Sequence, residues 1–179
     1  MRTCAHCGIN INGKRAGARY CSTSCRVMGN RAPKLPNVMT GSARWVTWEP
    51  VERREGTGKR PTRVDGRPAS VTDPTTWATY EEVAQCARKG WVLGNGVGCI
   101  DLDHCLNEAG IPAGWARAVL EEHRAEAVWV EISPSGRGLH VFVPMEAGPG
   151  RVIRDGRNIE VYPPGSGRFV CVTGRCFRF

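Results

Sequence analysis

Two aspartates one residue apart are the most chemically suggestive feature of the sequence. Asp101 and Asp103 lie in "GCIDLDHC", at the end of a short apolar segment. Because side chains alternate across a strand, both carboxylates are expected on the same face and close together. No Lys or Arg adjoins them in sequence. Their mutual repulsion therefore needs a metal ion or a shared proton, unless the segment is a loop that keeps them apart.

Two further polar residues interrupt strand-like segments, His140 in "GLHVFV" and Glu160 in "NIEVYP". Each lies beside Ile, Leu or Val, so each costs stability unless it has a partner. Two Asp and a Glu offer oxygen ligands, which suit Mg²⁺ or Mn²⁺ rather than zinc. A His that is not a ligand can bind phosphate or transfer a proton. The preceding "SPSGRG" supplies hydroxyls, backbone N–H groups and Arg137, a candidate cradle for phosphate oxygens.

Four of the nine cysteines form two close pairs near the N-terminus. Cys4 and Cys7 have C-x2-C spacing, and Cys21 and Cys25 have C-x3-C spacing. Four thiolates in two such pairs predict a tetrahedral structural zinc site, since a module this short has no other core to fold around. His6 is a poorer candidate ligand because it lies inside the first pair.

Positive charge is concentrated in the first part of the chain, whose formal net charge is +8. Residues 1–70 hold 14 Lys and Arg against 4 Asp and Glu, whereas residues 71–179 hold 11 against 13. Such asymmetry indicates a polyanion partner, most often nucleic acid, with a merely solvated surface as the alternative.

No apolar run approaches the roughly 18 residues that cross a membrane. The N-terminus "MRTCAHCGIN" lacks the apolar core of a signal peptide. We therefore expect a cytoplasmic protein with no membrane partner.

Three parts are expected along the chain: a zinc module at residues 1–28, a Pro- and Gly-containing linker at 29–43, and a larger domain at 44–179. The larger domain should begin with the strand "RWVTWEP". A polar, basic segment at 51–77 follows, with little regular structure expected, and a helix is expected within 72–90.

The remaining elements are two short strands, a helix at about 112–125, and four further strands. The strand-like segments are "WVLGN", "VGCIDLD", "AVWVEIS", "GLHVFVP", "NIEVYP" and "GRFVCVTG". This order predicts an α+β fold with a mostly antiparallel sheet and helices packed on one face.

Four stretches give the larger domain a family resemblance: "ASVTDPTTWATYEEV", "GWVLGNGVGCIDLDHCL", "EISPSGRGLHVFV", and "NIEVY" followed by "RFVCVTG". It resembles the catalytic domain of the archaeo-eukaryotic primase superfamily, in particular the primase-polymerases of phages and plasmids. The resemblance covers residues 44–175. The family's acid-pair motif matches Asp101 and Asp103, its histidine motif matches His140, and its third, acidic motif matches Glu160.

The resemblance implies a DNA primase or polymerase, a nucleotidyltransferase that extends a primer on single-stranded DNA and releases pyrophosphate. Asp101, Asp103 and Glu160 would hold two catalytic Mg²⁺ or Mn²⁺ ions. These ions would join the triphosphate of the incoming nucleotide to the 3′-hydroxyl of the primer.

The resemblance also implies contacts to nucleotide and template. His140 would contact the triphosphate, and the other nucleotide-binding candidates are Ser135, Arg137 and Arg168. The zinc module and the basic segment would bind template phosphates, which predicts steep salt dependence. Their candidate residues are Lys14, Arg15, Arg19, Lys59 and Arg60. The chain carries no helicase, so a separate replicative helicase is a candidate partner.

One departure from the family is that its second motif often has Ser two residues before the His, where this chain has Gly138. The hydroxyl is either supplied by Ser133 or Ser135 or missing. A metal-dependent nuclease is disfavoured, since such enzymes usually use a nearby Lys and none occurs in 90–179. The alternative from another class is a non-catalytic, zinc-dependent nucleic-acid-binding protein. It explains the basic N-terminus but leaves the acidic residues unexplained.

Overall fold

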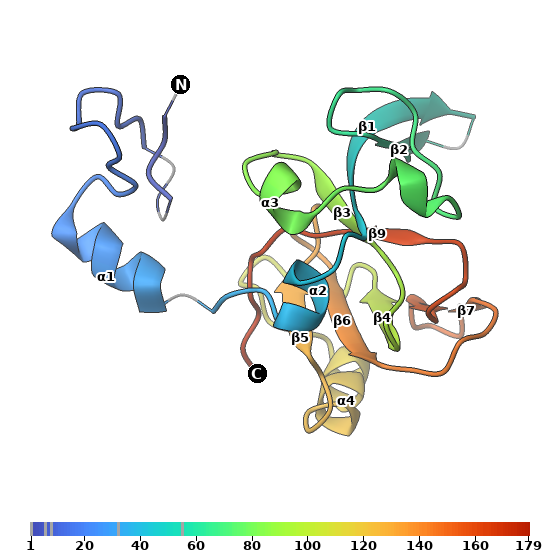
Figure 1. Cartoon of the computed structure of the whole chain (residues 1–179). Coiled ribbons are helices and arrows are strands. Elements are labelled where there is room, and N and C mark those ends of the chain that lie inside the picture. The colour runs from blue at the N-terminus through green and yellow to red at the C-terminus, as the bar shows by residue number, and fades with distance from the viewer. Residues whose placement is uncertain (1, 6, 8, 32, 55) are drawn as a thin grey trace. The chain divides into compact units, whose positions relative to one another are not determined.

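The computed structural model describes residues 2–5, 7, 9–31, 33–54 and 56–179. The chain divides into two units, Met1–Lys34 and Leu35–Phe179 (Figure 1). The boundary falls inside the segment that the sequence indicated as a linker, residues 29–43. None of the helices in the described ranges is both long and apolar enough to cross a membrane.

The N-terminal unit combines tight turns with one helix, α1 (Thr23–Arg31). The helix starts after Ser22, whose Oγ accepts a hydrogen bond from the N–H of Cys25 at 3.1 Å. Cys4 and Ile11 are the apolar residues that the described part of this unit buries. So small a core cannot hold a unit together by itself, so its fold depends on the cysteine cluster.

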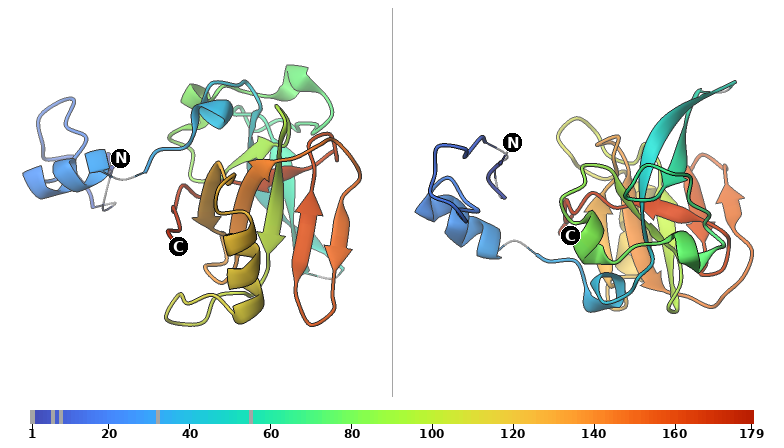
Figure 2. Two further views of the ribbon diagram at one scale, coloured as in Figure 1. Left: turned by 90° about the horizontal axis from the view of Figure 1, so that it is seen from below. Right: turned by 45° about the horizontal axis from the view of Figure 1, so that its top comes forward.

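The larger unit contains two antiparallel sheets (Figure 2). A four-stranded sheet has the order β2-β1-β3-β9, and a five-stranded sheet has the order β5-β6-β4-β8-β7. The strands are β1 (Trp45–Arg53), β2 (Gly56–Thr62), β3 (Lys89–Val92), β4 (Val97–Leu102), β5 (Trp129–Ile132), β6 (Leu139–Pro144), β7 (Arg151–Ile153), β8 (Ile159–Tyr162) and β9 (Phe169–Cys171). All paired strands in the described ranges run antiparallel, which confirms the prediction of a mostly antiparallel fold.

One face of the five-stranded sheet packs against helix α4 (Gly114–Glu122). Ala116 and Leu120 of the helix share a core with Leu102, Leu139 and Ile159 of the strands. These side chains are at most 4% exposed, so the part of this face under the helix is apolar and buried.

The opposite face shares a second core with the four-stranded sheet. The rings of Trp91 and Phe142 meet edge to face, with centroids 6.4 Å apart, and so link the two sheets. Two short helices, α2 (Asn37–Thr40) and α3 (Tyr80–Val83), add Met39 and Val83 to this core.

The long helix expected within 72–90 is wrong. The segment contains a 3-10 turn, η1 (Pro74–Thr76), capped by Asp73, and the one-turn helix α3, capped by a capping box of Thr79 and Glu82. Between them Trp77 is extended, because Ala78 exchanges two backbone hydrogen bonds with Trp45 of β1. Pairing with another strand thus overrides the helical pattern of the local sequence.

The prediction of little regular structure at 51–77 is also wrong, because β1 and β2 form a long hairpin there. Polar cross-strand pairs replace the missing apolar alternation. Glu49 forms an ion pair with Arg60, and the hydroxyls of Thr47 and Thr62 are 2.8 Å apart. Within the expected linker, α1 reaches residue 31 and α2 spans residues 37–40, so regular structure occurs there as well.

Candidate active site

Four polar residues lie in one row across the five-stranded sheet. In the strand register Asp101 pairs with His140 on one side and with Glu160 on the other. Glu131 pairs with His140 and extends the row onto β5. Cross-strand partners project from the same face of a sheet, so the register alone brings these four side chains together.

The row borders the core between the two sheets. Residues two positions away on the same strands project from the same face, and these are Trp129, Phe142 and Cys99. All three belong to the core that the sheets share. The end of the polar row nearest this core is therefore buried, and the exposed fractions of His140 and Glu131 are 3% and 0%.

A pocket of about 260 Å³ opens over the row. Asp101, His140 and Glu160 line one side of it. Several of its other lining residues belong to β2 and β9 of the four-stranded sheet. The full set is Gly58, Lys59, Tyr162, Arg168, Phe169, Val170 and Cys171. Lys59 and Arg168 supply positive charge. The pocket therefore has carboxylates that can bind a metal cation and basic side chains that can bind phosphate oxygens.

The electrostatics centre on Asp101. Burial, together with the charges of Asp103 and Glu160, raises the pKa of this carboxyl to about 6, against the opposing effects of His140 and Lys59. Its Oδ1 atom is buried without a hydrogen-bond partner, and the nearest ring nitrogen of His140, Nε2, is 3.9 Å away. That distance is too long for a hydrogen bond.

Asp103 lies just beyond the end of β4 but still faces the same site. Carboxylate oxygens of Asp101, Asp103 and Glu160 lie within 4.8 Å of one another. Three carboxylates at this spacing, one with an unpartnered buried oxygen, are a donor set that fits a hard divalent cation such as Mg²⁺ or Mn²⁺. The triad could therefore bind metal.

Glu160 has partners that the sequence did not reveal. Arg154 forms an ion pair with Oε1, and the hydroxyl of Tyr162 donates a hydrogen bond to Oε2. Burial and the hydrogen bond to Glu160 raise the pKa of Tyr162, so the phenol stays protonated and keeps donating. Both contacts fix the orientation of Glu160 toward the site, as hydrogen-bonded metal ligands require. Tyr162 lies two residues after Glu160 on β8, and the turn between β7 and β8 brings Arg154 to the same carboxylate.

Ser133 occupies the space that the family's serine would need. A Cβ on Gly138 would lie 2.9 Å from Ser133 Oγ and 2.8 Å from the carbonyl oxygen of Leu102. Ser133 is buried and its Oγ lies 3.0 Å from Ser135 Oγ. The Ser133 hydroxyl therefore lies beside position 138, and its replacement of the family's serine stays a prediction.

The other nucleotide-binding candidates lie in different places. Arg168 lines the pocket, and its guanidinium lies over the ring of Tyr162 at 5.4 Å. Ser135 and Arg137 are in the exposed loop between β5 and β6 and do not line the pocket. The N–H of Arg137 donates to Ser135 Oγ at 3.2 Å, which orders this loop.

Of the two basic candidates on β2, Lys59 lines the pocket and Arg60 pairs with Glu49 instead. The sequence argument against a nuclease considered only lysines after residue 90. That argument was wrong, because β2 brings Lys59 to the acidic residues from the other sheet.

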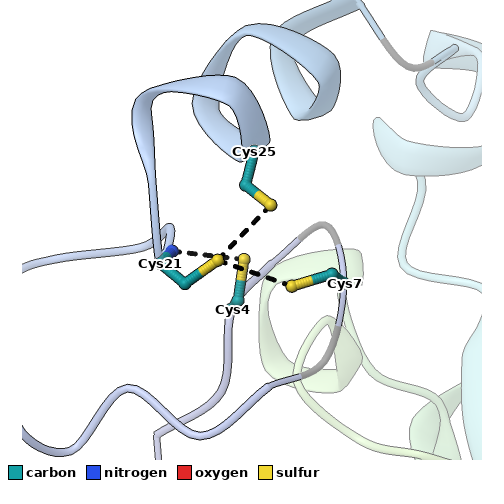
Figure 3. Close-up of side chains that lie close together, drawn as sticks. All are labelled: Cys4, Cys7, Cys21 and Cys25. Carbon is teal, nitrogen blue, oxygen red and sulfur yellow. Dashed lines mark hydrogen bonds between the residues drawn. The ribbon is translucent and has the colours of Figure 1, made fainter.

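The four N-terminal cysteines form a compact cluster (Figure 3). Their Sγ atoms lie within 4.8 Å of one another, with Cys21 Sγ 3.6 Å from Cys7 Sγ and 3.4 Å from Cys25 Sγ. Thiolates at about 2.3 Å from a tetrahedral zinc ion lie about 3.8 Å apart, close to these separations. The cluster could therefore bind zinc. His6 lies outside the described residues.

The basic candidates of this unit surround a groove beside the cluster. Lys14, Arg15 and Arg19 line it together with Arg26 and the start of α1. The guanidinium of Arg2 donates to the backbone carbonyls of residues 12, 14 and 15 and so holds the basic turn in place.

The chain is similar in sequence to a known protein. No protein-family model matches the chain. A DNA primase-polymerase of Nitratiruptor phage NrS-1 is 37% identical over 152 residues, which covers 75% of this chain. The chain is thus similar to a phage DNA primase-polymerase. It spans 20% of the length of that relative, and the similarity supports the family resemblance that the motifs indicated.

Asp101→Asn should stabilise the metal-free protein at pH 7.5. The native pKa of about 6 lies above the ordinary value, so ionisation costs native stability as pH rises from about 4 to 6, and the loss persists above that. Because Asn does not ionise, the variant should have a free energy of unfolding roughly 1–3 kcal/mol higher than the wild type at pH 7.5 and an equal one at pH 3.5. Chemical denaturation at both pH values measures this. Mn²⁺ should raise the melting temperature of the wild type and not of the variant, and a metal-induced shift that persists in D101N would contradict the assignment.

Gly138→Ala should destabilise the protein, because its new methyl group meets the Ser133 hydroxyl and a backbone carbonyl. The expected loss is about 1–3 kcal/mol in the free energy of unfolding. Gly114→Ala is the matched control, since a Cβ there meets nothing within 4 Å, and it should be neutral or slightly stabilising. Equal stabilities of the two variants would show that the space at Gly138 is not filled.

Cys21→Ser should remove the metal from the N-terminal unit and unfold that unit alone. Amide signals of residues 2–34 in a ¹H–¹⁵N spectrum should collapse, whereas those of 35–179 should stay in place. Elemental analysis should find about one zinc per chain in the wild type and none in the variant. Cys86→Ser, at a half-buried thiol outside the cluster, is the control and should keep both zinc and spectrum.

Proposed function

We propose that this chain is a DNA primase-polymerase unit that adds nucleotides to a primer on a single-stranded DNA template. The reaction is a phosphoryl transfer in which the 3′-hydroxyl of the primer attacks the nucleotide and pyrophosphate leaves. The observation that carries the proposal is the pocket in which Asp101, with its unpartnered oxygen, and Glu160 face Lys59 and Arg168. The similarity to a phage primase-polymerase supports the same reaction.

Asp101, Asp103 and Glu160 are the residues that would hold Mg²⁺ or Mn²⁺. Bound there, the ions would activate the attacking oxygen and stabilise charge on the leaving pyrophosphate. Arg154 and Tyr162 keep Glu160 turned toward this position.

The cationic side of the pocket binds the triphosphate in this proposal. Lys59 and Arg168 balance its charge, and His140 contacts a phosphate oxygen from the floor of the pocket. Lys59 lies on β2 and Arg168 directly before β9, whereas Asp101 and Glu160 lie on strands of the other sheet, so in this proposal the triphosphate lies between the two sheets. Ser135 and Arg137 remain candidates for contacts at the rim.

The N-terminal unit serves as a zinc-dependent template-binding module in this proposal. Its basic groove, lined by Lys14, Arg15, Arg19 and Arg26, suits the phosphates of single-stranded DNA. Template and nucleoside triphosphates are the partners, and a separate replicative helicase would supply unwound DNA in the host cytoplasm.

A primer-extension assay tests the proposal. Labelled primed and unprimed single-stranded DNA are incubated with the protein, Mg²⁺ or Mn²⁺, and ribo- or deoxynucleotides. The wild type should lengthen the primer, and Asp101→Ala/Asp103→Ala should abolish extension because the metal donors are lost. Asp155→Asn, an exposed acid paired with Arg157 outside the pocket, should extend like the wild type.

Each other outcome assigns a different function. A primer that becomes shorter would indicate a metal-dependent nuclease, which Lys59 beside the carboxylates would also suit. If neither the wild type nor any variant extends the primer, but DNA binding is retained in a gel-shift assay, the chain is the non-catalytic nucleic-acid-binding protein. Products from unprimed template would show that the chain also starts primers.

A further inference from the structure

Glu131 has no role in the proposed chemistry, although it belongs to the polar row. It is 0% exposed and does not line the pocket. A carboxylate in such a position is costly unless its oxygens are fully hydrogen-bonded. Its burial and its pairing with His140 therefore indicate a specific role.

The two oxygens of Glu131 share four polar contacts. Oε2 accepts hydrogen bonds from the indole N–H of Trp129 at 3.0 Å and from the N–H of Gly174 at 2.8 Å. Oε1 accepts one from the N–H of Thr173 at 2.9 Å and lies 3.2 Å from Nδ1 of His140. Burial opposes ionisation, but these contacts outweigh it and lower the pKa of Glu131.

This arrangement determines how the imidazole is held. An ionised carboxylate only accepts hydrogen bonds, so Nδ1 of His140 carries the hydrogen between the two groups. The other nitrogen, Nε2, points to Asp101 and the pocket. Phe142 meets the ring edge to face, with centroids 6.3 Å apart, and limits its rotation.

We propose that Glu131 is a positioning residue for nucleotide binding, which fixes the His140 ring so that Nε2 faces the phosphates of the bound nucleoside triphosphate. The inference rests on the proposed function of the pocket and adds a residue that does not touch the substrate. Its alternative is a purely structural role, in which Glu131 ties β5 to the segment after β9 through Thr173 and Gly174.

Glu131→Gln separates the two roles because of where its amide group can lie. At the Oε2 position the NH2 group would face two N–H donors, those of Trp129 and Gly174. At the Oε1 position it faces one donor and the ring of His140, which can accept at Nδ1 in its other tautomer. The variant should therefore keep the ties through Oε2 and move the hydrogen of the ring from Nδ1 to Nε2.

Long-range ¹H–¹⁵N spectra of the histidine rings measure this directly. The wild type should show His140 with hydrogen on Nδ1, assigned by the loss of its signals in His140→Asn. E131Q should lose that signal while the other histidine signals keep their positions. This spectrum needs neither metal nor nucleotide.

A double-mutant cycle supplies the functional measurement. E131Q should lower kcat/KM for the nucleotide roughly 10-fold or more, mostly through KM, as is typical for residues that orient a contacting group. If Glu131 acts through His140, E131Q/His140→Asn should match His140→Asn alone within about twofold. A structural role would instead lower activity equally in both backgrounds.

Two variants control for unrelated effects. Glu126→Gln makes the same Glu-to-Gln change in another Glu–His pair, Glu126 with Nδ1 of His123, at the surface beyond the end of α4, and should leave KM unchanged. Trp129→Phe removes one donor to Glu131 without touching His140, so it should lower stability while KM stays within about twofold.

The outcomes are distinct. Loss of the Nδ1 signal together with non-additive kinetics supports the proposal. Additive losses, a KM increase in Trp129→Phe equal to that in E131Q, or a His140 ring without Nδ1–H in the wild type overturns it. The wild-type spectrum decides this last point even if E131Q does not fold. If the wild type neither binds nor incorporates nucleotides, the proposed function fails, and the ring spectra alone decide whether Glu131 fixes His140.

Discussion

The repulsion between carboxylates held close together in a half-buried place is the constraint on which this structure depends. Asp101, Asp103 and Glu160 are brought within 4.8 Å by strand register. The fold offsets part of their charge with Arg154 beside Glu160 and with His140 and Lys59 near Asp101. One oxygen of Asp101 stays without a partner, so a cation could complete the site.

The sequence singled out three of the four residues of the row, and Glu131 was not among them. Asp101, His140 and Glu160 stand out because a polar side chain inside an apolar strand has a cost that one sequence already reveals. Their pairing across β6, β4 and β8 agrees with that expectation. The antiparallel fold also follows, since short strand-like segments separated by turn residues dominate the larger unit.

The errors arose where long-range pairing competes with local pattern. Residues 72–90 have helical spacing and good caps, but the bridge of Ala78 to Trp45 forces an extended residue into the middle. The β1–β2 hairpin is held by polar pairs such as Glu49 with Arg60, which look like loop composition. Glu131 and Arg154 were missed as site residues, whereas Lys59 was expected among the nucleic-acid-binding residues and lies in the pocket. Lys59 reaches the pocket only through the packing of the two sheets, which the basic composition around it does not reveal. Glu131, by contrast, lies between Val130 and Ile132 and carries the same signal of a polar residue in an apolar strand as Asp101.

Residues from the segments of both sheets line the pocket, and this affects how the unit folds. Lys59 and Arg168 belong to the chain segments of the four-stranded sheet, whereas the carboxylates belong to the five-stranded one. Neither sheet alone encloses the pocket, so the pocket forms only when Trp91 packs against Phe142 and the sheets dock. Such non-local docking is slow to form and cooperative. A ligand that contacts both sides of the pocket therefore links the two sheets, and its binding energy is added to the stability of the docked state.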